Sequence, residues 1–265
     1  MALLQAKDAA EDLGYNVLHM YVDGLWVQQE GITAAEQVQP LLAEITRRTG
    51  LPIALDGIFD WIAFLPSRQD NRVPVPNRFF GVFQDGTIKL RGVEARRRDT
   101  PRWVASTQEA LIALLAGERD PARLPLQLPE AVDLLRRALG QLQRGQVALD
   151  DLLVVHKMSR SAGEYQVRSA AVRAVEQLPG FAQPPSAGEM VRFIYTRGGQ
   201  GVLPLEAFEA APAPLIDQGR YTGLLLRAAH TVLEPLGISY DVLFDLVVHR
   251  IYQNRLNWNG QTVWH

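Results

Sequence analysis

The stretch FFGVFQDGTIKLRGVEARRRD, residues 79–99, combines the pattern of a β-hairpin with a run of arginines. Residues 78–83 and 87–90 are predicted strands, and between them stands Asp85-Gly86, a pair that favours a tight turn between antiparallel strands. From Arg68 to Arg102 the chain carries nine lysines and arginines against four acidic residues. Arginines beside aromatic residues suit contacts with phosphates and bases, but a solvated hairpin in which Glu94 and Asp99 neutralise neighbouring arginines fits the pattern equally well.

A second hairpin is predicted in residues 14–27, GYNVLHMYVDGLWV. Residues 16–22 form a β-prone run, Asp23-Gly24 is the expected turn, and residues 25–28 form the return strand. Two paired strands hold a carboxylate at their turn in a fixed position. A hard divalent cation that binds phosphate oxygens needs such a carboxylate as a ligand. Because Asp-Gly is also common in ordinary turns, Asp23 is either a metal ligand or a plain turn residue.

The remaining elements predict an α+β fold. Helices are expected over 2–13, 129–142, 161–178, 218–236 and 241–255, with capping boxes at Thr33/Glu36 and Ser106/Glu109 starting two more, and strands over 58–65 and 190–195. The proline-bearing segment 118–128 is predicted to be a linker between residues 1–117, an α+β part, and residues 118–265, a mostly helical part. The glycine-rich segment 196–201 is predicted to be a loop, and Trp258 and Trp264 to be packing anchors or partner contacts.

Composition excludes several classes of protein. The 265 residues are 47% hydrophobic and 21% charged, which predicts a folded chain of one or two domains. A net charge of −2 excludes a uniformly basic surface but allows a local basic patch. The absence of cysteine excludes disulfides and zinc ribbons, and the five histidines lack metal-ligand spacing. No apolar run reaches about 18 residues and residues 1–14 do not resemble a signal peptide, so we expect no membrane contact and a cytoplasmic location.

The two hairpin segments together resemble family B DNA polymerases. Residues 14–27 resemble the motif C hairpin, and its Asp-Thr-Asp core aligns with Tyr21-Val22-Asp23. Residues 79–99 resemble the segment that leads from palm to thumb, whose Arg-Gly-x-Glu-x-x-Arg-Arg-Asp element is intact at Arg91, Gly92, Glu94, Arg97, Arg98 and Asp99. Segments 152–159, 188–195 and 221–238 follow the family order, so the resemblance implies a partial palm in 1–117 and a thumb in 118–265.

The sequence departs from that family at the residues that carry catalysis. The family's two-metal chemistry needs aspartates of motifs A and C, and this sequence has no counterpart of motifs A and B, the exonuclease domain or the fingers. Tyr21 replaces the first motif C aspartate, and a tyrosine hydroxyl is neutral near pH 7. The Lys-Lys-Arg-Tyr-like motif reads PNRF at 76–79, with two fewer cations and one fewer hydroxyl.

The resemblance implies double-stranded or primer–template DNA as the partner of a set of basic and aromatic side chains. These are Arg78, Phe79, Lys89, Arg91, Arg96, Arg97, Arg98, Lys157, Arg160, Tyr165 and Arg168. We expect a DNA-binding module that is inactive alone, needs no cofactor, and acts as an accessory subunit in DNA replication or repair.

Two alternatives remain open at this stage. In the first alternative, the chain is the C-terminal half of a split polymerase, in which Asp23 holds Mg²⁺ together with a partner subunit carrying motifs A and B. In the other alternative it is a protein–protein scaffold without DNA binding, which the net charge of −2 favours.

Overall fold

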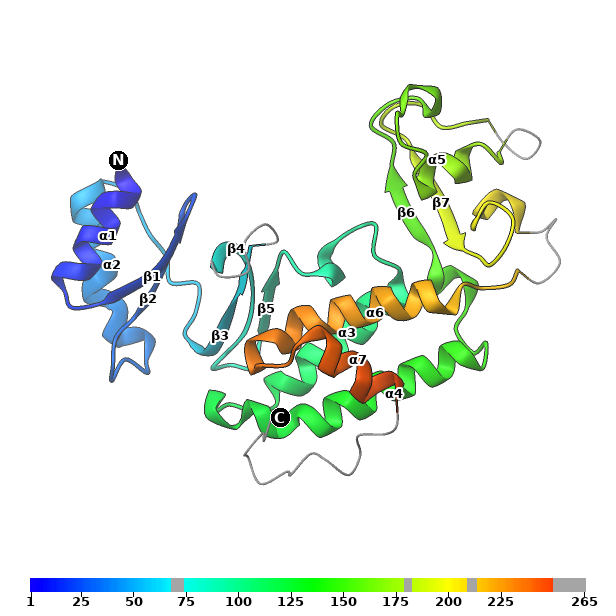
Figure 1. Ribbon diagram of the computed structural model, residues 1–265. Helices are drawn as coiled ribbons and strands as arrows, with labels where there is room; N and C mark the ends of the chain where they lie inside the picture. Colours follow the sequence, from blue (N-terminus) through cyan, green and yellow to red (C-terminus); the bar gives the residue numbers. More distant parts are fainter. Residues whose placement is uncertain (68–73, 179–182, 209–213, 250–265) are drawn as a thin grey trace. The chain divides into compact units, whose positions relative to one another are not determined.

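The computed structural model describes residues 1–67, 74–178, 183–208 and 214–249, and these form two compact units (Figure 1). The first unit comprises Met1–Gly92 with Arg119–Pro121, and the second comprises Val93–Glu118 and Ala122–His265. The sequence placed the division at 117/118, whereas residues 93–118 belong to the second unit. Trp258 and Trp264, and the end of the helix expected over 241–255, lie outside the described residues.

The first unit is built around a two-stranded hairpin and a three-stranded sheet, both antiparallel. Strands β1 (Asn16–Tyr21) and β2 (Gly24–Gln28) form the hairpin, and β3 (Phe59–Pro66), β4 (Pro74–Phe83) and β5 (Ile88–Arg91) form the sheet in that order. Helices α1 (Ala2–Asp12) and α2 (Ala35–Thr49) pack together through Ala9, Leu41 and Ile45, and Val17, Leu25 and Val27 of the hairpin join the same core.

The opposite face of the hairpin meets the sheet through aromatic rings. Trp26 lies 5.5 Å from Phe79 and 5.9 Å from Phe64 between ring centroids, and His19 lies 4.3 Å from Phe64. Alternation along β2 and the register shift between Val17 and His19 of β1 therefore give the hairpin one aliphatic face for the helices and one aromatic face for the sheet.

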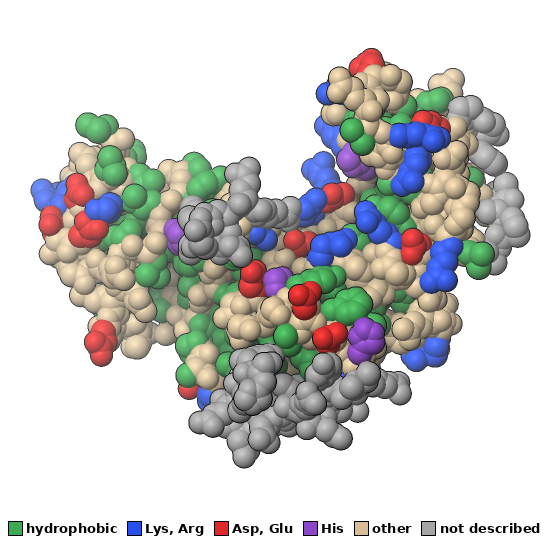
Figure 2. All heavy atoms as spheres, viewed as in Figure 1, with side chains coloured by type: hydrophobic (Ala, Val, Ile, Leu, Met, Phe, Trp, Pro, Cys, Tyr) green, Lys and Arg blue, Asp and Glu red, His purple; other side chains and the backbone are tan. Residues whose placement is uncertain are grey.

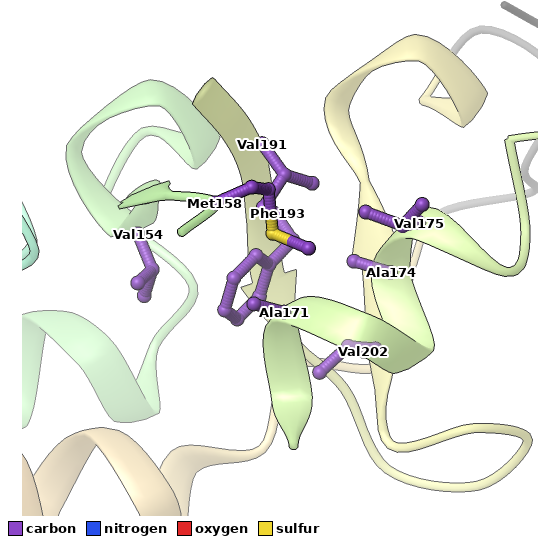
Figure 3. Packing of buried hydrophobic residues seen from close by; sticks show 8 residues of the cluster. All are labelled: Val154, Met158, Ala171, Ala174, Val175, Val191, Phe193 and Val202. Atoms are coloured by element: carbon purple, nitrogen blue, oxygen red, sulfur yellow. The ribbon is translucent and has the colours of Figure 1, made fainter. Parts of the chain in front are cut away.

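The second unit combines a helical group with a small sheet. Its helices are α3 (Arg102–Ala116), α4 (Leu128–Gln143), α6 (Gln218–Leu233) and α7 (Tyr240–Val248), and its strands are β6 (Val154–Lys157), β7 (Met190–Tyr195) and β8 (Val202–Pro204), covered by α5 (Ala170–Val175). Met158, Phe193 and Val175 lie at the centre of the core between α5 and the sheet (Figure 3). The antiparallel sheets beside packed helices confirm the α+β class.

The buried Tyr221 side chain of α6 connects the helices of this unit to its sheet. Its hydroxyl donates to the Leu152 carbonyl at 2.7 Å and accepts from the Tyr195 amide at 3.0 Å. Burial raises the pKa of Tyr221, so the hydroxyl keeps its proton and can serve both partners.

Several expected boundaries were wrong for identifiable physical reasons. Ser106 lies inside α3 and donates to the Trp103 carbonyl, because the helix already begins after Pro101. At α2 the reciprocal bond comes from Gln37, whose side-chain oxygen accepts from the Thr33 and Ala34 amides at 2.9 Å each, rather than from Glu36. The helix expected over 161–178 is reduced to α5 and a short 3-10 turn at Ala162–Glu164, and much of the expected linker is a 3-10 helix, Pro121–Gln127.

Candidate nucleic-acid interface

The tip of the first hairpin differs by one residue from the expected turn. Tyr21 pairs with Gly24, so the two-residue loop is Val22-Asp23, and Gly24 begins the return strand. Val22 has a φ of 54°, the left-handed region that a β-branched residue rarely enters, and its side chain is 75% exposed. Asp23 is exposed and forms no hydrogen bond or ion pair with the described residues.

Tyr21 lies beneath a cation. The Arg91 guanidinium carbon is 5.2 Å from the centroid of the Tyr21 ring, a cation–π contact between the end of β1 and the end of β5. The resemblance gives an aspartate to the Tyr21 position, so a neutral ring and an arginine occupy a place expected to hold negative charge.

These residues do not fit a two-metal centre. Two Mg²⁺ ions need several carboxylate oxygens between them, and within the described ranges no group of three or more Asp, Glu or His side chains is placed to hold an ion. Asp23 offers a single carboxylate at the turn, and the Arg91 guanidinium lies over the ring of Tyr21, two positions earlier in the chain.

The β4 and β5 side chains expected to grip DNA already have partners in this unit. Lys89 pairs with Asp56, and Arg78 donates to the carbonyls of Pro66 and Gly92. Phe79 is 1% exposed and packs in the aromatic cluster, so its ring has no surface with which to touch a nucleic acid. Of these side chains, the exposed Arg91 remains able to reach a ligand.

The Arg-Gly-x-Glu-x-x-Arg-Arg-Asp element has structural roles. Gly92 has a φ of 68°, and a Cβ there would lie 2.4 Å from the Asn77 carbonyl oxygen, so only glycine fits. The buried Gln108 donates from Nε2 to the Glu94 carboxylate at 2.9 Å, and its Oε1 accepts from the Ala95 amide at 2.6 Å.

Of the last three residues of the element, Arg97 and Asp99 bond to each other, whereas Arg98 is exposed. Arg97 donates to both carboxylate oxygens of Asp99 at 2.9 and 2.7 Å. Arg97 lowers the pKa of Asp99 through these hydrogen bonds. Arg98 is exposed and has no ion-pair or side-chain hydrogen-bond partner among the described residues.

Four basic side chains from two segments define what we call the basic surface: Arg96, Arg98, Lys157 and Arg160. All are exposed, and among the described residues none forms an ion pair. The ion pair between Arg102 and Asp151, at 3.7 Å, connects the segment that follows Arg96 and Arg98 to the segment that precedes Lys157 and Arg160. Lysine and arginine side chains gather on the viewed face of the second unit near β6 and β7 (Figure 2). Guanidinium and ammonium groups without acidic partners suit phosphate oxygens.

Two other expected contacts flank this surface with different outcomes. The Tyr165 hydroxyl accepts from the Ser159 amide at 2.8 Å and lies 3.0 Å from the Ser159 hydroxyl, while Arg160 lies 5.5 Å from its ring centroid. The Ser159 bonds lower the pKa of Tyr165. Arg168 donates to Glu176 at 2.8 Å and to Gln200 at 3.0 Å, so its charge is already neutralised.

Sequence reasoning missed Ser159 and Gln108, which position Tyr165 and Glu94. Each is polar and unremarkable in sequence, and its role depends on neighbours between six and 120 positions away, such as Tyr165 for Ser159 and Ala228 for Gln108. In the sequence, only the nearby Tyr165 indicates a role for Ser159.

None of the described helices is long and apolar enough to cross a membrane.

Comparison with known proteins assigns the family. The chain is 21% identical over 239 residues to DNA polymerase 1 of Sulfolobus acidocaldarius, covering 90% of this chain and 26% of that protein. It is 21% identical over 235 residues to DNA polymerase 1 of Aeropyrum pernix, covering 88% of this chain and 23% of that protein. The chain therefore spans about a quarter of the length of these relatives.

A solved structure agrees with the sequence comparison. The family B DNA polymerase of Pyrobaculum calidifontis superposes with a TM-score of 0.62 and 21% identity over 89% of this chain and 29% of that one. The sequence model of DNA polymerase family B matches residues 77–241, which include β5, the basic surface and α6. Because that match covers more than half of the chain, the protein belongs to DNA polymerase family B.

Proposed function

We propose that this chain is a DNA-binding palm–thumb module of the family B type that does not polymerise DNA by itself and acts as an accessory subunit in replication or repair. In this proposal residues 1–117 correspond to the partial palm and residues 118–265 to the thumb. The observation that carries the proposal is the basic surface: Arg96, Arg98, Lys157 and Arg160 are exposed and form no ion pair with the described residues.

The hairpin tip supports the absence of activity in the isolated chain. Tyr21 supplies no carboxylate at the position of the first motif C aspartate, and Arg91 over its ring adds a positive charge that opposes a nearby metal ion. Asp23 alone would hold Mg²⁺ weakly, since this ion gives up its waters reluctantly.

Primer–template binding at a series of KCl concentrations tests the DNA-binding part. If four phosphates meet the four basic side chains, the slope of log K against log salt is about −4. Arg98→Ala reduces the magnitude of that slope by about 1 and weakens the binding of all DNA sequences alike.

The adjacent Arg97→Ala is the matched control. It breaks the ion pair with Asp99, so it lowers the melting temperature but leaves the DNA affinity of the folded protein nearly unchanged. Affinity that does not depend on salt, or no affinity, contradicts the proposal and favours a scaffold.

A primer-extension assay with Mg²⁺ tests the second part. The isolated chain is expected to extend no primer, and extension by the isolated chain would overturn the proposal. The assay measures catalysis and the salt series measures binding, so the two parts fail independently.

A split polymerase is the second candidate, and the exposed Asp23 favours it. A carboxylate at a turn without a partner among the described residues is accessible to a metal ion held jointly with another chain. In a complex with a subunit carrying motifs A and B, Asp23→Asn would abolish extension, while the exposed Glu30→Gln control would not. Equal extension by both variants would make Asp23 a turn residue only.

A further inference from the structure

A groove of the second unit lies apart from the basic surface, between α4 and α7. It has a volume of about 510 Å³ and is lined by Arg136, Arg137 and Arg144 of α4 and its C-terminal cap, Thr222 of α6, and Val247 and Val248 of α7. Figure 1 shows α7 running beside α4 in this unit. None of the described residues that line the groove is Asp or Glu, so the groove combines three guanidinium groups with an apolar wall.

Arg136 is fixed as part of the wall. Its Nε and Nη2 donate to the Leu246 carbonyl at 3.0 and 2.6 Å, which satisfies a carbonyl in the last turn of α7. Its Nη1 lies 3.5 Å from Asp133, so part of its charge is neutralised outside the groove.

Arg137 and Arg144 remain the uncompensated cations of the groove. Both are exposed, and neither forms an ion pair with any residue in the described ranges. Arg144 donates from Nε to the neutral side-chain oxygen of Gln146 at 2.9 Å, which orients its guanidinium without removing its charge.

Gly140 makes room for that orientation. Glycine inside a helix is less favourable than alanine by about 1 kcal/mol. A Cβ on Gly140 would lie 3.0 Å from Nη1 of Arg144, so the glycine allows the Arg144 side chain to lie back along α4. Residues 136, 140 and 144 follow one another at helical spacing, so Arg136, Gly140 and Arg144 line the same side of the groove.

We propose that this groove binds an oligophosphate group through Arg137 and Arg144, with Arg136 as a fixed third cation. A guanidinium group can donate two parallel hydrogen bonds to phosphate oxygens. The volume of the groove suits a ligand of nucleotide size. The apolar side chains of Val247 and Val248 would pack against the remainder of the ligand. A free nucleoside triphosphate and the phosphodiester backbone of a strand share this chemistry. The site is independent of the basic surface and of the hairpin tip.

Titration calorimetry of the full chain with sodium tripolyphosphate tests the site. We expect binding that Arg137→Ala with Arg144→Ala weakens by about tenfold or more, since each lost charged hydrogen bond matters at that scale. Arg123→Ala is the control, because Arg123 is exposed, faces Glu118 at 3.6 Å and lies outside the groove. No binding tighter than about 1 mM, or equal losses in both variants, overturns the proposal.

Gly140→Ala separates the ligand site from a purely structural groove. The alanine favours the helix, so the melting temperature should not fall, while displacement of Arg144 should weaken tripolyphosphate binding severalfold. Unchanged binding by this variant contradicts the role of Arg144.

Competition experiments distinguish the source of the phosphate. dATP that displaces tripolyphosphate from the groove identifies a free nucleotide as the ligand. A single-stranded oligonucleotide that displaces it, tested in the Arg96→Ala/Arg98→Ala background so that the basic surface is weakened, identifies a strand. Failure of both competitors overturns the proposal.

Discussion

Val22 stores strain at the hairpin tip. Its φ of 54° is unfavourable for a β-branched side chain, and the side chain is 75% exposed, so it gains little from packing. We expect Val22→Gly to stabilise the protein by about 1 kcal/mol, because relief of strain exceeds the entropy that glycine adds to the unfolded chain. Chemical denaturation measures the change. Val167→Gly is matched in exposure, also 75%, but has no positive φ, so it should destabilise; equal effects of the two variants would contradict strain at Val22.

His19 gives the first unit a dependence on pH. Burial against Phe64 lowers the pKa of His19, so the folded state binds fewer protons than the unfolded state. Stability therefore falls as pH decreases through the unfolded value of about 6.5, and above that value His19 has no effect. We expect the difference in melting temperature between His19→Phe and the parent to shift in favour of the variant between pH 8 and pH 5.5. A constant difference would show that protonation of His19 is not linked to folding.

Gln108 joins three elements of the second unit. Its side chain accepts from the Ala95 amide within the 3-10 turn Glu94–Arg96 and donates to the Ala228 carbonyl of α6 at 2.7 Å, while its own backbone belongs to α3. Gln108→Leu leaves these buried backbone groups unsatisfied, and we expect a loss of about 2–4 kcal/mol in the free energy of unfolding. Gln5→Leu, at an exposed position in α1, should change it by less than about 0.5 kcal/mol. Similar small losses in both would rule out the network as a stabilising contact.

Each of the two units contains a cluster of buried residues of its own, and we expect the two units to unfold separately. Leu41 is buried between α1 and α2, and Leu225 is fully buried in α6. A buried Leu→Ala change removes about 2–5 kcal/mol. Scanning calorimetry should show two transitions, with Leu41→Ala lowering one and Leu225→Ala lowering the other. A single transition that both substitutions shift would mean that the units unfold together.

Some features of the fold could be predicted because their cause is local. The hairpins around Asp23 and Asp85, strand β7 and helix α6 follow from turn residues and apolar spacing within a dozen positions. Strands β6 and β8 were missed because four- and three-residue strands carry little periodic signal and depend on pairing with β7. The start of α3 was misplaced because Ser106 and Glu109 fit a capping box in sequence, whereas Pro101 had already ended the preceding segment.

The candidate site also combines features with a local cause and features that depend on distant parts of the chain. The family resemblance, the tyrosine at the position where the resemblance gives an aspartate, and the local excess of arginine could be read from residue identity and spacing alone. Which cations are available depended on the folded structure: Arg97 and Asp99 bond across two positions, but Lys89 pairs with Asp56, and Arg91 with Tyr21, from distant positions in the sequence. Charge neutralisation falls off with distance in space rather than in sequence, so identical arginines become structural or exposed only once the chain has folded.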